Sequence, residues 1–331
     1  MGVGVNDHFR SRLKRVSSRG GRARGSPTVE VESNSARLVA AQALLAAGAR
    51  NKAEIVGSAR RGDISARNLE LRFLLHLPSL ITPDYSADDP TVQEMLDRLV
   101  QEATDARATL PLSVESPAHP ATTPKELEFA RVDSETAAIV HRACHYIASP
   151  RNGDSFGLFT ARDARLSTLV TVSEFDLGHV APQLPATVES AAVLVVSRVL
   201  SFDWAPRDCI SYLLARVVDW LRKSRPGIKL LLTYVNPNIG FAGTSYRAAN
   251  WQLFGWEWGT RCAYVNGRYR TDRQLIGEFG TAETLALRQL LGDRFAVNAV
   301  PLSPLMLFAY GLDAAVRIEL AAERDFRNPY G

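Results

Sequence analysis

A polar break between two apolar segments holds the side chains best suited to chemistry in this 331-residue chain. The apolar run Leu230–Val235 stops at an Asn-Pro-Asn-Ile-Gly turn, and Tyr246 follows ahead of a second aromatic run. The amides of Asn236, Asn238 and Asn250 can orient a carbonyl or amide group of a ligand. Asparagines beside a proline are also ordinary turn residues. The stretch predicts either a reactive site at the end of a buried strand or a plain turn.

The elements that must position these residues alternate between strands and a helix. Residues 191–200 and 228–235 are almost continuously apolar, as expected for strands buried on both faces. The segment 205–224 between them begins with a proline in its first turn and repeats apolar residues at helical spacing. These apolar residues are Ile210, Leu213, Leu214, Val217 and Leu221. Strand, helix and strand in this order predict a βαβ unit with parallel pairing.

Further elements are expected on both sides of this unit. Helical spacing predicts helices over residues 35–49, 66–77, 89–109, 134–147 and 282–291, and a short helix over 243–250. Strands are expected over residues 155–161 and 166–176, joined as a hairpin, from residue 252, and over 295–300 and 305–310. The predicted organisation is a basic leader (1–34), a helical region (35–110), a Pro-rich linker (111–124), an α/β domain (125–312) and a C-terminal tail (313–331).

Two spaced groups of residues carry a resemblance to a known family. They are Ser197, Arg198, Pro206 and Ser211 upstream, and Tyr234, Pro237, Gly240, Gly243, Tyr246, Ala248, Asn250, Trp251 and Gly255 downstream. Both groups resemble the Mom family of phage DNA adenine-modification proteins, over about residues 125–312. The order of elements is similar to the GNAT acyltransferase fold. The expected fold class is therefore α/β, a mixed, centrally splayed sheet flanked by helices and preceded by a helical region.

The resemblance implies transfer of an acyl or acyl-like group from a coenzyme A thioester, such as acetyl-CoA, to the exocyclic amine of a DNA adenine. Tyr246 resembles the tyrosine with which many GNAT enzymes protonate the departing thiolate, and Asn236 would orient the reactants. Asn236 and Phe241 stand where the family has an aspartate and a histidine. An amide cannot act as a general base. Adenine would have to leave the base stack or be single-stranded.

Two other functions stay open at this point. The same fold could acetylate a small-molecule or protein amine instead of a nucleobase. A catalytically degenerate protein that binds nucleic acid or serves as a scaffold is the other alternative, and the Asn236 and Phe241 departures favour it.

The donor site is expected around the helix that starts near residue 205. A helix N-terminus presents unpaired N–H groups that suit a pyrophosphate, and Arg207 can add a charge-assisted contact. Arg198 ends a buried strand and needs a partner, which is a phosphate, the acyl group or a salt bridge. The predicted cofactor-binding residues are Arg198, Arg207, Ser211 and Asn250. The alternative for Arg207 is an ordinary solvated side chain at a helix start.

A nucleic-acid face is predicted from arginines interleaved with aromatic residues. The arginines are Arg247, Arg261, Arg268 and Arg270, and the aromatic residues are Trp251, Trp256, Trp258, Tyr264 and Tyr269. Such rings can stack on bases. An exposed strand pair with alternating polar residues would show the same pattern. The leader adds seven basic residues against one aspartate in residues 1–25, so the rest of the chain carries −2 of the total +4. The leader can neutralise phosphates or remain solvated.

Composition excludes several classes of protein. Three widely spaced cysteines are no disulfide framework and suit a reducing compartment. No segment reaches the length of a membrane span and no secretory signal is visible, so a soluble cytoplasmic protein is expected, with a homodimer left open. His141 and His145 lie four apart beside Cys144, but without a partner motif, and no metal is predicted. A nucleophile elbow and a phosphate loop are absent.

Overall fold

The structure is a computed structural model that describes residues 66–76, 90–107, 109–298, 302–320 and 323–330. The predicted leader and the predicted helix over residues 35–49 lie outside the described residues. None of the described helices combines the length and apolar character that crossing a membrane requires.

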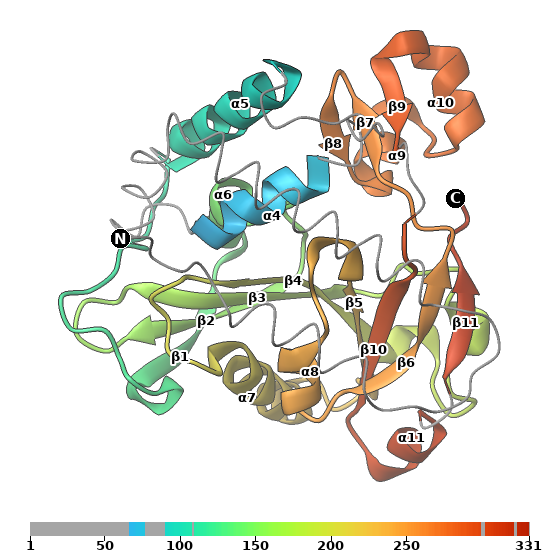
Figure 1. The fold of residues 1–331 in the computed structure, drawn as a ribbon. Coiled ribbons are helices and arrows are strands. Elements are labelled where there is room, and N and C mark those ends of the chain that lie inside the picture. Colours follow the sequence, from blue (N-terminus) through green and yellow to red (C-terminus); the bar gives the residue numbers. More distant parts are fainter. Residues whose placement is uncertain (1–65, 77–89, 108, 299–301, 321–322, 331) are drawn as a thin grey trace, which may run out of the picture.

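An eight-stranded mixed sheet forms the body of the protein (Figure 1). Its strand order is β1-β2-β3-β4-β5-β10-β6-β11. The strands are β1 (Leu127–Val132), β2 (Asp154–Thr160), β3 (Leu166–Glu174), β4 (Val193–Ser201), β5 (Leu230–Val235), β6 (Gln252–Trp258), β10 (Leu305–Gly311) and β11 (Arg324–Arg327). The predicted hairpin is β2 and β3, which pair antiparallel.

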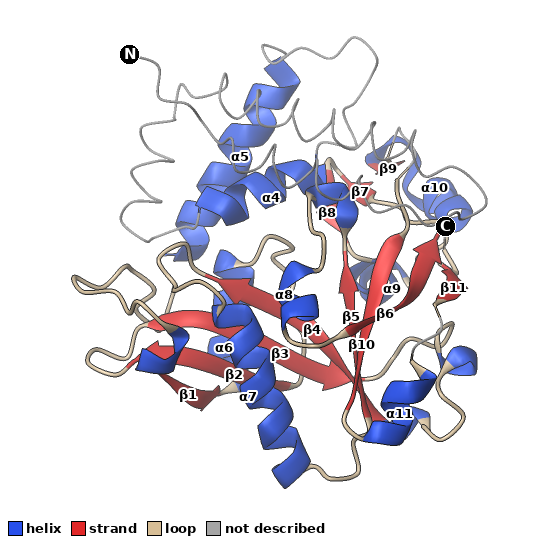
Figure 2. Cartoon of the chain, turned by 60° about the horizontal axis from the view of Figure 1, so that its bottom comes forward, coloured by secondary structure: helices blue, strands red, loops and turns tan. Residues whose placement is uncertain are grey.

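The predicted βαβ unit is formed by β4, α7 (Cys209–Ser224) and β5, whose two strands are parallel. Their register covers only Val193–Val195 opposite Leu230–Leu232. Beyond it, the Thr233 hydroxyl donates to the Val196 carbonyl at 2.9 Å, a side-chain bond in place of a ladder bond. The strands separate toward their carboxyl ends, as Figure 2 shows. A centrally splayed mixed sheet with flanking helices confirms the expected fold class.

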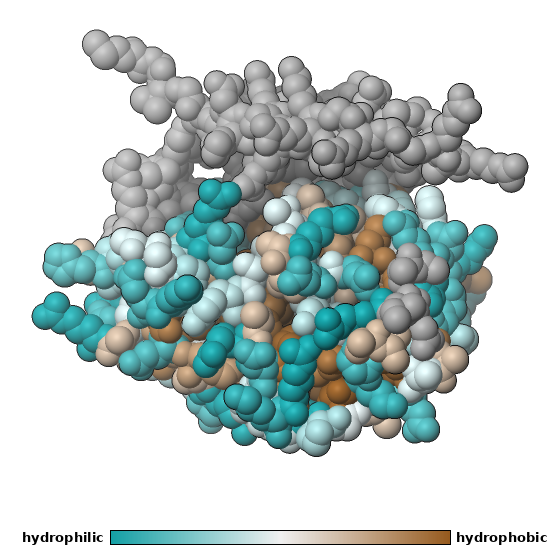
Figure 3. All heavy atoms as spheres, turned by 90° about the horizontal axis from the view of Figure 1, so that it is seen from below, coloured by the Kyte–Doolittle hydropathy of each residue, from teal (hydrophilic) through white to brown (hydrophobic). Residues whose placement is uncertain are grey.

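Helices cover both faces of the sheet. The helix α7 and the short helix α8 (Thr244–Ala248) lie on one face, and α4 (Ala66–His76), α5 (Pro90–Arg107) and α6 (Ser134–Cys144) lie on the other (Figure 1). The predicted stripe of α7 is confirmed, because Leu213, Leu214, Val217 and Leu221 are buried in one core cluster with the sheet. The outward face of α7 is charged, and the surface seen from that side is mostly hydrophilic (Figure 3).

The segment of the chain between β6 and β10 forms a second, three-stranded sheet. It consists of β7 (Ala263–Val265), β8 (Arg268–Arg270) and β9 (Phe295–Val297), with α9 (Asp272–Phe279) and α10 (Thr284–Leu291) packed on it. The sequence analysis predicts α10 and β9 but neither β7, β8 nor α9. Three-residue strands are too short for an alternating pattern to be read.

The N-terminal helices are packed onto this body. The Arg72 guanidinium, on α4, donates to the carbonyls of Ala143 (2.6 Å) and His145 (3.1 Å) at the end of α6. The Tyr264 hydroxyl donates to the Leu75 carbonyl at 2.8 Å. In this way α4 joins α6 to the small sheet.

Segments on both sides of the predicted α/β domain pack against the main sheet or join it. Trp204 Nε1 donates to the Val114 carbonyl at 2.9 Å, so the predicted linker packs against β4. Near the C-terminus, α11 (Ala314–Glu319) leads to β11, which pairs parallel with β6. The sheet therefore extends beyond residue 312, where the sequence predicts a tail. Short 3-10 turns lie at residues 124–126, 181–183, 190–192, 237–239 and 292–294.

Gly255 makes this last pairing possible, and replacing it with alanine is expected to destabilise the protein. A Cβ at Gly255 would lie 2.1 Å from the Arg324 carbonyl oxygen, which belongs to the backbone of β11. Such overpacking costs about 1–3 kcal/mol in the free energy of unfolding. Urea unfolding measures it. Gly277→Ala, in α9 with nothing within 4 Å of the new methyl, is the control. Equal stability of the two variants would contradict the prediction.

Candidate active site at the splayed strands

A cavity of about 670 Å³ opens where β4 and β5 separate. Its walls come from β4, β5, the turn leading to α8, α8 itself, the segment after α6, and α4. Tyr246, Asn236 and Arg198, which the sequence analysis assigns to catalysis and cofactor binding, all line it. These three residues are thus brought together, although 48 positions separate the outermost two along the chain.

Tyr246 stands at the point where the strands part. Its hydroxyl lies 3.3 Å from the Thr233 hydroxyl, which also bonds the Val196 carbonyl of β4. Its ring stacks on Phe308 with centroids 6.0 Å apart and meets Trp251 edge-on at 5.4 Å. Burial raises the pKa of Tyr246 to about 12, against an opposing effect of the Thr233 contact. The phenol therefore stays protonated at neutral pH and is available as a proton donor.

Asn236 has a fixed orientation. Its Oδ1 accepts from the backbone N of Asn238 at 2.9 Å and from Asn238 Nδ2 at 3.0 Å. None of the described residues accepts from Asn236 Nδ2, which leaves that donor for a ligand in the cavity. Asn238 in turn exchanges two hydrogen bonds with the backbone of Ser303. The second asparagine of the motif thus joins the turn to the segment before β10 rather than facing a ligand.

Arg198 is a partly buried cation. Its Nε donates to the Ser149 carbonyl at 2.7 Å and its Nη1 to the Ser197 carbonyl at 2.6 Å. Burial lowers the pKa of Arg198 to about 10, so the guanidinium remains charged at neutral pH. Among the described residues it forms no ion pair, so the salt bridge left open by the sequence is not formed. A charge partly buried without a counterion suits an anionic or carbonyl-bearing ligand.

Aromatic side chains line the cavity on the side of α4 and α6. Tyr146 stacks on His145 with centroids 4.4 Å apart and lies 5.7 Å from Phe241. Tyr269, from β8, also lines the cavity. The sequence analysis misses Tyr146, although it directly follows the His-Arg-Ala-Cys-His segment that drew attention to metal binding. Phe241 takes the place of the family's histidine, and it adds a ring to this wall instead of a base.

The two histidines of α6 are buried and neutral. His145 Nδ1 accepts from the backbone N of Ile147, and burial sets the pKa of His145 well below its usual value. His141 Nε2 lies 2.8 Å from the Thr171 hydroxyl. Within the described part of the chain, no group of three or more His, Cys, Asp or Glu residues is placed to hold a metal ion.

His141 is expected to make folding stability depend on pH. Burial, followed by the charge of Arg198, lowers the pKa of His141 to about 3, from 6.5. Because the unfolded chain takes up the proton first, stability is complete above pH 6.5 and falls as pH drops toward 3. The slope is roughly 1.4 kcal/mol per pH unit. In His141→Gln, urea unfolding between pH 6 and pH 5 should show a slope smaller by this amount. His119→Gln, at an exposed position, is the control. If wild type and His141→Gln showed the same dependence of unfolding free energy on pH, the role of His141 would be refuted.

A second hollow of about 550 Å³ lies between α7 and the end of α8. Ser211 and Asn250, both predicted for cofactor binding, line it together with Trp251 and Tyr310. Ser211 Oγ already donates to the Asp208 carbonyl at 2.9 Å. Asn250 adopts a left-handed φ of 62°, as asparagine does more readily than most residues. These two residues therefore line a hollow on the α7 face and do not line the cavity that contains Arg198.

The start of α7 differs from the predicted pyrophosphate site. Arg207 is exposed and lines neither hollow. The residue that caps the helix is Asp208, which has a left-handed φ of 66° and makes no side-chain cap. Its carboxylate would oppose an anion at that helix end.

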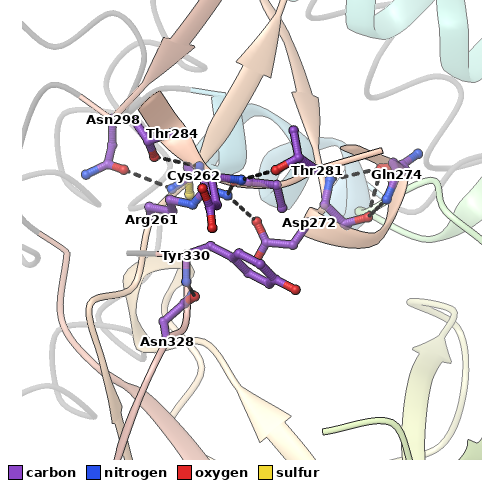
Figure 4. Close-up of polar contacts among 12 residues, drawn as sticks. Arg261, Cys262, Asp272, Gln274, Thr281, Thr284, Asn298, Asn328 and Tyr330 are labelled. Atoms are coloured by element: carbon purple, nitrogen blue, oxygen red, sulfur yellow. Dashed lines mark hydrogen bonds and ion pairs between the residues drawn. The ribbon is translucent and has the colours of Figure 1, made fainter. Parts of the chain in front are cut away.

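The predicted face of four arginines does not form. Arg261 is only 6% exposed and its guanidinium bonds Asp272 at 2.7 Å and Thr284 at 2.9 Å (Figure 4). Arg268 pairs with Glu102 at 3.0 Å and Arg270 with Glu278 at 3.6 Å. Arg247, which is on α8, lies over the ring of Phe308. Trp251 and Tyr264 are buried and unavailable for stacking on bases. Arg261, Arg268 and Arg270 are therefore each paired with a carboxylate of the protein itself.

The carboxylate of Glu257 stabilises a residue that lines the cavity. The Glu257 carboxylate lies 2.5 Å from His179 Nε2 and accepts from the Tyr234 hydroxyl. Burial and the Glu257 charge raise the pKa of Tyr234 far above its usual value. Since Tyr234 lines the cavity, Glu257 holds one of its walls in place.

Comparison with known proteins adds a family to this geometry. A model described as the Mom protein family matches residues 126–300. No curated protein matches the chain. An N-acetyltransferase structure from Staphylococcus aureus is similar at 10% identity and a TM-score of 0.33, covering 56% of this chain and 99% of its own. A spermidine/spermine N-acetyltransferase from Vibrio cholerae in complex with manganese is similar at 9% identity and a TM-score of 0.33, covering 59% of this chain and 98% of its own. An acetyltransferase from Salmonella typhimurium with its cofactor acetyl-CoA is similar at 7% identity and a TM-score of 0.34, covering 57% of this chain and 95% of its own.

Proposed function

Because the chain belongs to the Mom protein family, we propose that it transfers an acyl or acyl-like group from a coenzyme A thioester to the exocyclic amine of adenine in DNA. The observation that carries this proposal is the cavity at the splayed strands of an acyltransferase-like fold, where a buried phenol and a wall of aromatic rings face the same space. The phenol suits the thiol end of a donor, and the rings suit a planar acceptor.

The donor would enter from the side of α7 and α8. The β4 backbone past Val195 lacks its β5 partners, so its polar groups can bond a ligand lying between the strands. In the reaction, the amine nitrogen forms a bond to the carbonyl carbon and the C–S bond breaks. Tyr246 donates its proton to the departing thiolate. The amine loses one proton as it is acylated, and a proton returned to the Tyr246 phenolate through solvent regenerates the neutral phenol, so the overall proton count is unchanged.

The acceptor would enter from the side of α4 and α6. Tyr146, Phe241 and Tyr269 present ring faces or edges to the cavity, and stacking on such side chains is worth about 1–3 kcal/mol per base. An adenine inside a duplex cannot reach an enclosed cavity, so the base has to be flipped out or single-stranded. With Phe241 in place of histidine and an amide at Asn236, catalysis depends on alignment of the reactants rather than on a general base.

Nucleosides from host DNA provide the decisive test. The protein is expressed in a bacterial host, the DNA is digested, and the nucleosides are examined by mass spectrometry. We expect a modified deoxyadenosine with the wild-type protein and none with Tyr246→Phe. Unmodified adenine despite folded wild-type protein would contradict the proposed acceptor.

A thermal-shift measurement with acetyl-CoA separates an enzyme from a degenerate scaffold. Stabilisation at millimolar acetyl-CoA is expected, because a ligand that binds only the folded state raises the melting temperature. Absence of any shift would favour the scaffold alternative.

A further inference from the structure

One rim of the cavity carries a cluster of arginines around a single carboxylate. Asp176, which follows β3, accepts from Arg151 at 3.3 Å and also pairs with Arg273 of α9. Arg151, Asp176 and Arg273 line the same cavity as Arg198. We define these four residues as the arginine rim. They come from four separate parts of the chain: the segment before β2, the segment after β3, β4 and α9.

The arginine rim has more positive charge than its own carboxylate can neutralise. Arg151 and Arg273 share the single carboxylate of Asp176, and Arg198 forms no ion pair with any described residue. Arg151 Nε is buried without a hydrogen-bond partner. The nearby carboxylates of Glu257 and Asp272 are paired with His179 and Arg261, respectively. The rim thus carries two more positive than negative charges, and the partly buried Arg151 and Arg198 can gain a counterion when an anionic ligand binds.

The position of the rim assigns that anion to the acceptor side. Arg198 Nε bonds the carbonyl of Ser149, in the segment that follows α6, so this side chain leaves the sheet on the face opposite α7. Figure 1 shows α6 and α7 on opposite faces of the sheet. A donor held between α7 and α8 would keep its pyrophosphate on the other face.

We propose that Arg151, Arg198 and Arg273 bind a phosphate group of the acceptor, the phosphodiester next to the nucleobase held in the cavity. This inference rests on the proposed function and narrows its substrate class to a nucleotide within a nucleic acid. Guanidinium groups bind phosphate through paired N–H donors, and such charge-assisted bonds are among the strongest hydrogen bonds. Asp176 holds Arg151 and Arg273 in position when no phosphate is bound. The same rim repels cationic acceptors such as polyamines.

Binding of three small probes to the full-length protein tests the proposal. The probes are deoxyadenosine, deoxyadenosine monophosphate and coenzyme A, measured by isothermal titration. The monophosphate is expected to bind at least about tenfold more tightly than the nucleoside, because charged hydrogen bonds contribute about 1.5–3 kcal/mol. Equal binding of nucleoside and nucleotide would overturn the inference.

The variant Arg273→Gln tests whether the bound phosphate belongs to the acceptor or to the donor. Arg273 is 52% exposed, so its replacement should leave the fold intact. We expect this variant to lose about tenfold in affinity for the monophosphate and to keep its affinity for coenzyme A. Arg268→Gln, equally exposed but paired with Glu102 outside the cavity, is the matched control and should change neither. A loss confined to coenzyme A would assign the rim to the donor and refute the proposal.

The outcome is distinguishable from failure of the proposed function. If the wild-type protein prefers the monophosphate and Arg273→Gln removes that preference, the arginine rim is a phosphate site even where host DNA stays unmodified. If DNA is modified but the rim variants bind every probe like the wild type, the reaction stands and the phosphate site does not.

Discussion

Replacing Tyr246 with phenylalanine is expected to lower kcat for acyl transfer by about 100- to 10,000-fold, the usual contribution of a positioned general acid. The substitution removes one hydroxyl at the point where β4 and β5 separate and keeps the ring that packs on Phe308 and Trp251. Its only recorded polar contact within the described residues is with Thr233, so the fold should lose no more than about 1 kcal/mol. Steady-state kinetics with acetyl-CoA and an adenine-containing oligonucleotide measure the effect.

Two controls make this result specific to proton donation. Tyr330→Phe removes a phenol outside the cavity lining and should leave kcat unchanged. Acetyl-CoA binding to Tyr246→Phe should stay within about twofold of wild type, since the general acid acts on the transition state. Because the pKa of Tyr246 is about 12, wild-type activity should not fall between pH 8 and pH 10 through ionisation of this phenol. A fully active Tyr246→Phe protein would remove the assignment.

Replacing Arg261 with methionine is expected to lower the free energy of unfolding by about 2–3 kcal/mol, less than the full cost of breaking a buried ion pair because the Asp272 side chain is 34% exposed. Arg261 bonds the Asp272 carboxylate, the Thr284 hydroxyl and the Ala282 carbonyl, and so ties β7 to the starts of α9 and α10 (Figure 4). Burial already raises the pKa of Asp272, and Arg261 opposes that rise. Without the arginine, Asp272 would have to take up a proton or reach solvent.

Urea unfolding compares this variant with Arg268→Met, which breaks the exposed pair with Glu102. An exposed pair contributes at most about 1 kcal/mol, so the two variants should differ severalfold in cost. A cost below 1 kcal/mol for Arg261→Met would refute the structural role. The loss should also weaken the arginine rim, because α9 carries Arg273.

Local sequence patterns were sufficient for the central part of the fold. Continuous apolar runs predict β4 and β5, the apolar stripe predicts α7, and the polar turn marks where the strands end; each of these is present in the structure. Of the small sheet only β9 was predicted, and β7, β8 and β11 were not. Their three or four residues carry no readable period, and their pairing partners lie far along the chain.

The residues of the candidate site also fall into those that the sequence predicted and those that only the structure shows. Tyr246, Asn236 and Arg198 were found because they lie in or beside the motif-bearing segments, and the structure places all three on one cavity. Tyr146 and three members of the arginine rim, Arg151, Asp176 and Arg273, come from segments without a motif. Arg261 was assigned to a nucleic-acid face because it is one of four arginines interleaved with aromatic residues, and only packing shows that its partner is Asp272.

The amino-acid sequence by itself determined the elements of the βαβ unit and the end of the buried strand at which the reactive residues gather, because both follow from local hydrophobic periodicity and turn chemistry. Only the tertiary structure decided which charges remain without a partner. Arg261, Arg268 and Arg270 are neutralised by carboxylates distant in the chain or across a turn, whereas Arg198 is partly buried beside Arg151 with carbonyl partners alone. Ion pairing depends on three-dimensional distance, and no spacing in the sequence contains that information.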